Sequence, residues 1–304
     1  MLDLIIIGGS ATGTAAAVYA SRAQINFKVI AKDLGGEVAN SGEVGNYPGF
    51  NETNGIELSQ KFNDQLKYNK VEPEVGVEVE NITKEGGVFK VQAKEGKSYE
   101  AKTIILATGV RPRHLKVPGE EELYQKGLSY CSTCDGPLFK NKIVTTIGGG
   151  NAALESILMM SGLAEKVYAI NKNPEFQGEQ VYIKKLETLD NVELIYNAST
   201  TKILGDQVVS GVEYKATSSG ETKTIETNGV FVHVGIIPNT EMVKDLNVLD
   251  KGGFVEVNNL METKLSGFFA AGDVVNLPYN QIAISTGQGV TAFLTVQSYL
   301  NKLG

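Results

Sequence analysis

The chain has 304 residues, of which 42% are hydrophobic, and its 28 basic and 35 acidic residues give a formal net charge of −7. This length is enough for two hydrophobic cores, because single cores stop growing at about 250–300 residues. The acidic balance, without a long run of Lys or Arg, argues against nucleic acid as a partner. No segment approaches 18 consecutive apolar residues, and the opening apolar stretch is too short for a signal peptide. We therefore expect a soluble, cytoplasmic protein that does not cross a membrane.

The first predicted element is a buried strand over residues 2–7, which runs into the glycine-rich turn Gly8–Gly13 and an alanine-rich helix. This order is typical of a dinucleotide-binding βα unit, in which glycines let the backbone approach a pyrophosphate at the helix N-terminus. Ser10 stands where the pattern has its middle glycine. Taken alone, the substituted pattern would suit an ordinary tight turn equally well.

The same order of elements recurs about one domain length later, with a strand over residues 143–147, a turn over residues 148–153 and a helix that ends near Gly162. Each unit is followed by a second strand, a helix, short alternating strands and an apolar strand that ends in glycine. Two halves of like design imply two bound nucleotides. The predicted ranges are 27–31, 55–67, 77–83, 88–93, 98–102 and 103–109 in the first half, and 166–170, 179–189, 200–204, 208–215, 221–226 and 229–235 in the second.

The remaining C-terminal segment completes no third domain. It contains a strand that ends on Gly272-Asp273 and a helix from about Gln281 to Leu300. We expect this segment to return to the first half, so that the middle of the chain is an insertion. The predicted fold is α/β, with two Rossmann-like three-layer nucleotide-binding domains: residues 1–114 and 241–304 form the first, and 115–240 form the second. The linkers would lie near residues 115–119 and 238–243.

The only two cysteines are Cys131 and Cys134, and Asp135 follows them directly. With two intervening residues the sulfurs can form a small, strained disulfide, and the carboxylate is a proton acceptor, so the pattern indicates a redox dithiol. A permanent structural disulfide would close too short a loop to stabilise the fold much. A four-cysteine zinc site would need a second pair, for which only His114 and His233 could substitute, so we expect no metal site. In the cytoplasm a lone pair is more often catalytic than structural.

Five motifs agree in order and spacing with one known family. They are Cys-x-x-Cys-Asp-Gly at 131–136, Ala-Thr-Gly at 107–109, Gly-Gly-Gly-Asn at 148–151, Gly-x-x-Pro-Asn-Thr at 235–240, and Phe-Ala-Ala-Gly-Asp at 269–273 with Gln281 downstream. On these motifs the chain resembles, end to end, the low-molecular-weight thioredoxin reductase family. It is also similar to the C-terminal part of the flavoprotein component of alkyl hydroperoxide reductase. That flavoprotein carries an extra N-terminal pair of thioredoxin-like domains, and this chain starts at the FAD strand, so we expect a separate protein as thiol acceptor.

The resemblance implies FAD as a cofactor and a set of residues that bind it. These are Gly8, Ser10, Gly13, Gly36, Glu37, Asn46, Thr108, Gly109, Gly272, Asp273, Gln281, Ile282 and Ala283. Glu37 departs from the family's Gly-Gly-Gln, because an ionised carboxylate only accepts where an amide also donates. Asp273 would accept hydrogen bonds from ribityl hydroxyls, and the helix from Gln281 would point its N-terminus at the flavin. Asn46 could instead be a turn residue, and Asp273 a helix cap.

The resemblance places NAD(P)H on Gly148, Gly150, Asn151 and Ala152, with Lys172 beside them. After the second strand of this domain the family carries His-Arg-Arg-x-x-x-Arg, whose guanidinium groups hold the 2′-phosphate of NADPH. Residues 171–177 read Asn-Lys-Asn-Pro-Glu-Phe-Gln here, so that Lys172 is their only cation. No acidic residue ends the strand to favour NADH through the 2′-hydroxyl. The electron donor therefore stays open among NADPH, NADH and a ferredoxin-like protein.

The implied reaction passes a hydride from a nicotinamide to the flavin and then two electrons to the Cys131–Cys134 disulfide. The dithiol would reduce thioredoxin or a glutaredoxin-like protein by exchange, with Asp135 carrying protons. By resemblance Cys134 is the sulfur nearer the flavin, and the cysteine that attacks the partner is left open. The family also suggests a homodimer and a rotation of the inserted domain about its linkers. Alternatives are a flavoprotein that exchanges electrons with ferredoxin or a small oxidant, and a non-catalytic redox sensor.

Overall fold

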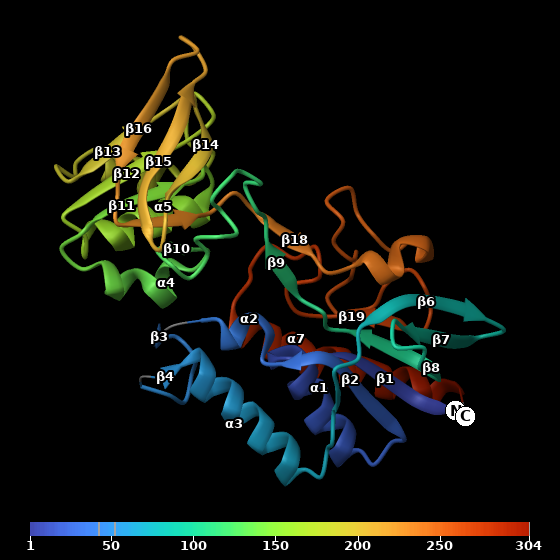
Figure 1. The fold of residues 1–304 in the computed structure, drawn as a ribbon. Helices are drawn as coiled ribbons and strands as arrows, with labels where there is room; N and C mark the ends of the chain where they lie inside the picture. The colour runs from blue at the N-terminus through green and yellow to red at the C-terminus, as the bar shows by residue number, and fades with distance from the viewer. Residues whose placement is uncertain (42, 52, 304) are drawn as a thin grey trace. The chain divides into compact units, whose positions relative to one another are not determined.

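The computed structural model describes residues 1–41, 43–51 and 53–303, without the side chains of residues 43 and 134. It divides the chain into two compact units, of which unit 1 comprises Met1–Arg111 and Ile237–Gly304, and unit 2 comprises Pro112–Ile236 (Figure 1). None of the helices that the structure describes combines the length and the apolar character that a membrane span requires.

Unit 1 is built on one mixed sheet, in which the described residues form seven strands in the order β5-β2-β1-β8-β7-β6, with β19 also paired to β8. Parallel pairing joins β1, β2, β5, β8 and β19, whereas β6, β7 and β8 form an antiparallel meander. The bounds are β1 Leu2–Gly9, β2 Phe27–Leu34, β5 Glu74–Val75, β6 Val79–Glu85, β7 Val88–Ala93, β8 Ser98–Leu106 and β19 Phe268–Ala270. A small hairpin pairs β3 Glu43–Val44 with β4 Thr53–Asn54.

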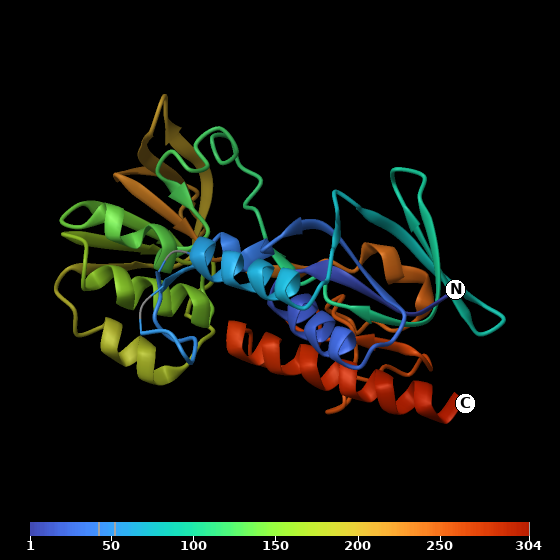
Figure 2. The same ribbon diagram turned by 90° about the horizontal axis from the view of Figure 1, so that it is seen from below.

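Side chains of the central strands alternate between two cores, as a pleated strand requires. On β1, Leu4 and Ile6 pack with helices α1 (Ala11–Arg22) and α7 (Ile282–Leu303). Ile5 and Ile7 instead pack with the β6–β7 meander and the C-terminal loops. Helices α1 and α7 lie side by side, as Figure 2 shows. Unit 1 therefore has three layers around one sheet, and its other helices are α2 Gly36–Ala39, α3 Gly55–Tyr68 and the 3-10 helix η2 Glu241–Leu246.

The C-terminal segment returns to the first half of the chain. Phe268, Phe269 and Ala270 of β19 pair in parallel with Ile104, Ile105 and Leu106 of β8. This pairing makes unit 2 an insertion in unit 1, and the predicted α/β fold class is confirmed.

One predicted boundary in unit 1 is wrong. The ranges 98–102 and 103–109 were expected to be two strands, because the first alternates polar and apolar residues and the second is continuously apolar. The structure has one strand, β8, whose first half pairs antiparallel with β7 while its second half lies between β1 and β19. The change of pattern therefore marks a change of environment within one strand and not a break in the chain.

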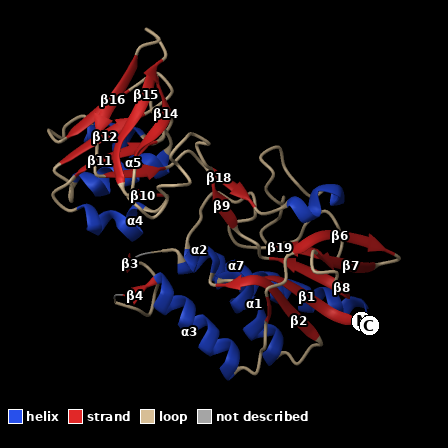
Figure 3. Cartoon of the chain, in the orientation of Figure 1, coloured by secondary structure: helices blue, strands red, loops and turns tan. Residues whose placement is uncertain are grey.

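Unit 2 repeats the layers with its own parallel sheet, β10-β17-β11-β12-β13, and a separate antiparallel sheet, β14-β15-β16 (Figure 3). Phe231 packs with the helices, whereas Val230 and Val232 pack toward the antiparallel sheet. The sequence pattern missed β10 and β13, which are only two and four residues long. The bounds are β10 Leu128–Ser129, β11 Ile143–Ile147, β12 Lys166–Ile170, β13 Val192–Ile195, β14 Ala198–Gly205, β15 Val209–Ala216, β16 Thr222–Glu226, β17 Gly229–Val232, α4 Ser132–Asp135, η1 Gly136–Phe139, α5 Asn151–Ser161 and α6 Gln180–Leu186.

The chain passes between the units twice, through strands β9 (Val110–Pro112) and β18 (Ile236–Pro238), which pair with each other. Apart from Pro238, the residues predicted as hinges lie outside these two strands. Around residues 115–119, the carboxylate of Glu120 accepts the main-chain N–H groups of Leu115 and Lys116 at 2.7 and 2.6 Å. Around residues 238–243, Val243 lies in the core of unit 1.

Candidate active site

The glycine-rich turn of unit 1 packs closely between its two central strands. Gly8 has a φ of +126°, and a Cβ at this position would overlap the carbonyl oxygen of Ala107, the residue that follows β8. A Cβ at Gly13 would likewise overlap the carbonyl oxygen of Gly8. Helix α1 begins at Ala11 without a side-chain hydrogen bond to its first N–H groups. Such an N-terminus can bind an anion with its main-chain donors.

Ser10 replaces the middle glycine of this turn without backbone strain. Its φ and ψ are −103° and −159°, and Gly150, the matching residue of unit 2, has −98° and −176°. Any residue can adopt this extended conformation. The hydroxyl of Ser10 donates to the carbonyl oxygen of Gly35, so it ties the turn to the loop before α2. Ser10 is thus bonded to the residue before Gly36, another of the residues predicted to bind FAD.

Glu37 and Asp273, which are 236 residues apart in sequence, interact electrostatically in unit 1. Partial burial raises the pKa of Glu37, a hydrogen bond with Asn40 opposes this effect, and the charges of Asp273 and Asp33 raise the pKa further. Gly36, which precedes Glu37 in α2, donates its N–H to Oδ1 of Asp33 at 3.0 Å. The carboxylate of Glu37, which replaces the glutamine of the family motif, is therefore influenced by two other carboxylates, those of Asp33 and Asp273.

Asp273 is held close to the start of α1. A Cβ on the preceding Gly272 would overlap Oγ1 of Thr12, and the N–H of Gly272 donates to Oε1 of Gln288 at 2.8 Å. The hydroxyl of Ser285 donates to Oδ1 of Asp273 at 2.9 Å. Burial raises the pKa of Asp273, and the Ser285 hydrogen bond opposes that change. The C-terminal segment thus brings a half-buried carboxylate to the glycine-rich turn.

A second long-range contact joins Asn46 to Gln281. Nδ2 of Asn46 donates to Oε1 of Gln281 at 3.1 Å, across 235 residues of sequence. The next residue, Ile282, packs against the apolar cluster of α2 and α3, and Ala283 is exposed in the first turn of α7. Three of the predicted flavin neighbours therefore meet in the folded unit.

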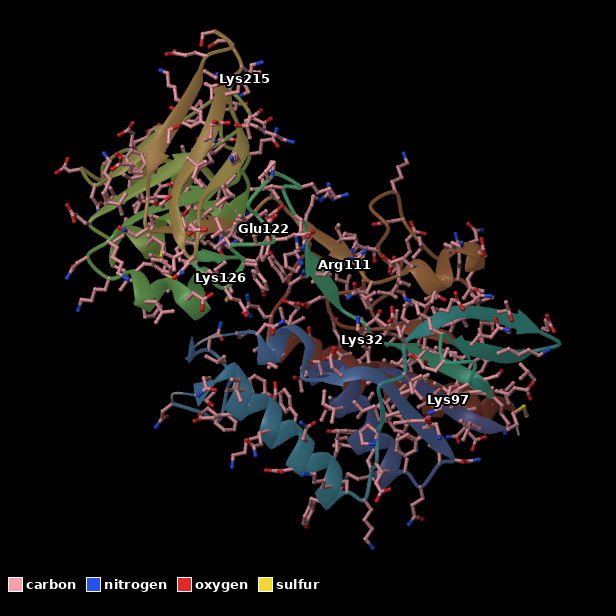
Figure 4. All side chains as sticks on the ribbon, in the orientation of Figure 1. Lys32, Lys97, Arg111, Glu122, Lys126 and Lys215 are labelled. Atoms are coloured by element: carbon pink, nitrogen blue, oxygen red, sulfur yellow. The ribbon has the colours of Figure 1, made fainter. Side chains whose placement is uncertain are left out.

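Thr108 and Gly109 lie where the chain leaves the sheet of unit 1. The hydroxyl of Thr108 donates to the main-chain oxygen of Asn239 at 2.7 Å, and the N–H of Asn239 donates to the carbonyl oxygen of Gly109 at 3.0 Å. Arg111, labelled in Figure 4, donates from Nη1 to Oδ1 of Asn239 at 2.6 Å. The side chain of Thr108 thus fastens the returning chain, a contact that sequence reasoning did not predict.

Unit 2 contains a turn of the same construction. Gly148 has a φ of +150°, and a Cβ here would overlap the carbonyl oxygen of His233, the residue that follows β17. The space beside Gly150 is open, and Ala152 is exposed in the first turn of α5. The side chain of Asn151 accepts the main-chain N–H of Glu179 at 2.8 Å. Asn151 therefore holds the segment after β12 against the turn.

That segment carries little positive charge. Asn171, which directly follows β12, is buried. Its Oδ1 accepts the N–H of Asn173 at 3.1 Å, and its Nδ2 donates to the carbonyl oxygen of Glu175 at 2.8 Å. Lys172 is exposed and makes no ion pair with the described residues. An internally bonded amide thus occupies the place where a dinucleotide-binding carboxylate would stand.

The redox motif forms one helical turn, α4, between the short strand β10 and the 3-10 helix η1. Cys131 is half-buried and disulfide-bonded, and the side chain of Cys134 lies outside the described residues. The N–H of Cys131 donates to Oγ of Ser129 at 3.0 Å, and the N–H of Asp135 donates to the carbonyl oxygen of Cys131 at 3.2 Å. Asp135 is half-buried at the end of this turn.

Side chains on both sides of Cys131 have partners that the sequence did not predict. The hydroxyl of Tyr130 donates to Oε1 of Glu120 at 2.9 Å and lies 2.9 Å from Nδ1 of His114. Oγ of Ser132 lies 2.7 Å from Nε2 of His233. Burial lowers the pKa of His233 to about 4. No local pattern could reveal the Ser132–His233 contact, because 101 residues separate the pair.

Comparisons with known proteins agree with this geometry. The family model for pyridine nucleotide-disulphide oxidoreductases matches residues 2–289. An alkyl hydroperoxide reductase protein of Pseudomonas aeruginosa is 38% identical over 305 residues, which cover 98% of this chain but 58% of that protein. Thioredoxin reductase of Lactococcus lactis superposes with a TM-score of 0.82 at 30% identity, over 99% of this chain and 100% of that one. Thioredoxin reductase of T. acidophilum gives 0.78 at 40% identity, over 100% and 99% of the two chains.

The resemblance found in the sequence motifs is confirmed by a family match over nearly the whole chain and by structural neighbours of nearly equal length. The chain belongs to the pyridine nucleotide-disulphide oxidoreductase family.

Proposed function

We propose that the protein is an FAD-dependent disulfide oxidoreductase that passes electrons from NAD(P)H through FAD and the Cys131–Cys134 pair to thioredoxin or a glutaredoxin-like protein. The observation that carries this proposal is the disulfide-bonded Cys131 in a helical turn that ends at Asp135. The pair lies in the unit that contains the second dinucleotide-type turn, and the structural neighbours named as thioredoxin reductases match the chain along its length.

FAD would be held by unit 1, whose residues fit it. The uncapped N-terminus of α1 and the close-packed Gly8 suit a pyrophosphate, and the half-buried Asp273 suits ribityl hydroxyls. Asn46 and Gln281, which contact each other, offer polar groups for the flavin ring. When bound, FAD supplies the step between a hydride donor and a dithiol.

The chain's own chemistry is thiol–disulfide exchange at the redox motif. Reduction of the disulfide takes up two electrons and two protons, and each exchange step needs a thiolate as the attacking group. Asp135, one residue beyond Cys134, is placed to take up and return protons. A mixed disulfide with the partner forms at one cysteine and is resolved by the other.

The electron donor is NADH or NADPH, with weak discrimination between them. Lys172 is a single exposed cation, and it cannot replace the two-pronged contacts of three arginines with a 2′-phosphate. The Gly148–Gly150 turn still offers a pyrophosphate site at the start of α5. The comparisons do not support ferredoxin better than NAD(P)H as the electron donor.

The acceptor and the assembly are further parts of the proposal. A thioredoxin-type partner follows from the structural neighbours, and a peroxiredoxin-type partner would follow from the relative named as part of an alkyl hydroperoxide reductase. By family analogy the protein forms a homodimer, and unit 2 rotates about the β9–β18 crossing. A lone redox cysteine pair is typical of a cytoplasmic enzyme.

The test is turnover of the purified FAD-loaded protein with thioredoxin under a supply of NADH or NADPH. Cys131→Ser and Cys134→Ser should each abolish thioredoxin reduction, although dithionite should still bleach the flavin. Thr133→Ser, a conservative change at an exposed position of the same turn, should keep wild-type turnover. Substantial turnover in either cysteine variant would show that electrons take another route. Reduction of a peroxiredoxin-type protein with no activity on thioredoxin would redirect the acceptor assignment.

A further inference from the structure

Ser132, the residue after Cys131, is anchored inside unit 2 by two side chains. It is 5% exposed, and its hydroxyl donates to Oγ of Ser156 on α5 at 2.7 Å. The same Oγ lies 2.7 Å from Nε2 of His233, which follows β17 directly. A helix and the end of a strand therefore both hold Ser132, one of the two residues between the cysteines.

The turn that carries the cysteines needs such anchors. Helix α4 has four residues, and its main-chain contribution includes the 3.2 Å bond from Asp135 to Cys131. One helical turn does not stabilise itself, because nucleation fixes several torsion angles for a single hydrogen bond. Thr133 is exposed, whereas Ser132 is buried and makes side-chain contacts with the interior of the unit.

The three polar groups can satisfy each other without a net charge. Burial lowers the pKa of His233 to about 4, so the imidazole is neutral near pH 7. A neutral ring has one N–H donor and one acceptor nitrogen. Nε2–H of His233 can therefore donate to Ser132 while the hydroxyl of Ser132 donates to Ser156, with one proton in each bond. An interaction of this kind depends on position and not on ionic attraction.

We propose that the Ser132–His233 contact is a positioning device that holds the α4 turn in the conformation in which the two cysteines are bonded, and so favours the disulfide over the dithiol. The inference rests on the proposed redox function of the pair. The contact is present together with the disulfide, so it and the covalent bond restrain the same turn. Two restraints on one turn support each other, because each lowers the conformational entropy that the other must remove. Without the contact, closing the disulfide would have to order a looser turn.

The equilibrium between the two forms gives the test. The holoprotein is equilibrated with graded ratios of reduced and oxidised dithiothreitol. The protein's dithiol gives up two electrons and two protons as its S–S bond forms, and oxidised dithiothreitol takes them up. Free thiols are then trapped by alkylation and counted by intact mass, which is unambiguous because the chain has two cysteines.

Two variants should shift this equilibrium and one should not. His233→Phe keeps an aromatic ring without nitrogen, and Ser132→Ala removes the hydroxyl. Each should favour the dithiol by roughly tenfold, which is about 30 mV for a two-electron couple. His233→Gln, which can place an amide near the position of Nε2, should stay close to the wild type. Retention of the wild-type potential by both His233→Phe and Ser132→Ala, or a shift toward the disulfide, would overturn the proposal.

A control and a double variant separate position from general destabilisation. Thr227 is buried in the same unit, and its hydroxyl bonds to the carbonyl oxygens of Ile143 and Gly229. Thr227→Val should lower thermal stability and leave the potential unchanged. The double variant Ser132→Ala/His233→Phe should shift the potential no more than the larger single shift, because Ser132→Ala already breaks the contact that His233→Phe removes. Additive shifts would contradict the proposal.

Failure of the inference and failure of the proposed function look different. If the wild-type cysteines cannot be cycled between the two forms by dithiothreitol, the redox function itself fails. If they cycle normally and the variants keep the wild-type potential, only the positioning role is lost.

Discussion

The side chains of Thr108 and Asn239 each donate a hydrogen bond to the main-chain oxygen of the other residue, at 2.7 and 2.9 Å. They are 131 residues apart, one on the segment that leaves unit 1 and the other on the segment that returns. The reciprocal pair therefore fastens both chain crossings on the side of unit 1. We expect any rotation of unit 2 to pivot at the two junctions of the units, next to Arg111 and next to Ile237.

Asn239→Ala should destabilise unit 1 by about 1–3 kcal/mol, because it leaves the carbonyl oxygen of Thr108 and the guanidinium of Arg111 without this partner. Thermal unfolding followed by flavin release would measure the loss. Glu241→Gln is the matched control: it disrupts the exposed Arg111–Glu241 ion pair, and such pairs contribute about 0–1 kcal/mol. Equal losses of stability in the two variants would show that the reciprocal Thr108–Asn239 bonds stabilise unit 1 no more than an exposed ion pair does.

Asp273→Ala should weaken FAD binding by about 10- to 100-fold. Hydrogen bonds to a charged group contribute about 1.5–3 kcal/mol, and each 1.4 kcal/mol is a factor of ten. Flavin fluorescence on dilution of the protein would report the dissociation. Asp245→Ala, which removes an exposed carboxylate of the same unit, should bind FAD as the wild type does. Unchanged affinity in Asp273→Ala would remove this residue from the proposed FAD site.

From the Gly148–Gly150 turn and the single cation Lys172 we predict less than about tenfold discrimination between NADH and NADPH. A tenfold difference in affinity corresponds to about 1.4 kcal/mol. Anaerobic stopped-flow titration of the oxidised protein with each nucleotide, followed by loss of flavin absorbance, would measure it. Lys172→Arg combined with Gln177→Arg places two guanidinium groups on exposed positions and should raise NADPH affinity at least tenfold, with NADH unchanged.

Two outcomes of that titration would change the assignment. Fast bleaching of the wild type by micromolar NADPH alone would mean that the missing arginines matter little. Bleaching by reduced ferredoxin, with neither nucleotide active, would instead make the protein a ferredoxin-linked flavoprotein.

We expect the folded protein to lose stability in acid because of His233. Burial holds the pKa of this imidazole at about 4, below the 6.5 of a free group. As the pH falls below 6.5, the unfolded chain binds a proton here while the folded chain does not, so the free energy of unfolding decreases until about pH 4. At 1.36 kcal/mol per pH unit the loss is on the order of 3 kcal/mol.

Denaturant unfolding of the wild type and His233→Phe at pH 7, 5.5 and 4.5 would measure this slope. The variant should lose less stability on acidification, because it no longer carries this group. Thr227→Val, which removes a buried hydroxyl and no titratable group, should keep the wild-type slope. Parallel pH profiles for His233→Phe and the wild type would contradict the assignment of this acid sensitivity to His233.

Features that follow from main-chain geometry could be predicted from the sequence. The turns at Gly8 and Gly148 were recognised because both need a glycine at a positive φ beside a neighbouring strand. Ser10 departs from the glycine pattern, but it does not strain the turn, because any residue can adopt its φ and ψ. The fold class followed from the repeat of these turns, and it is confirmed. The roles of the FAD and NAD(P)H residues stay predictions.

Features that depend on long-range packing could not be predicted. The strand β8 looked like two strands because its halves have different neighbours. The partners of Thr108 and Ser132 are 131 and 101 residues away, and a hydroxyl carries no sequence signal of which carbonyl or imidazole it will meet. The same holds for Asn46, whose partner Gln281 arrives with the last helix.

The pairing of β19 with β8 sets an order of events during protein synthesis. Unit 2 is one continuous stretch, so all its strands are available once Ile236 has left the ribosome. Unit 1 waits for Phe268–Ala270, and until they emerge the apolar residues 104–106 of β8 present an unpaired edge. An edge of this kind invites pairing with other chains. We therefore expect the inserted unit to fold first on the nascent chain and unit 1 to close last.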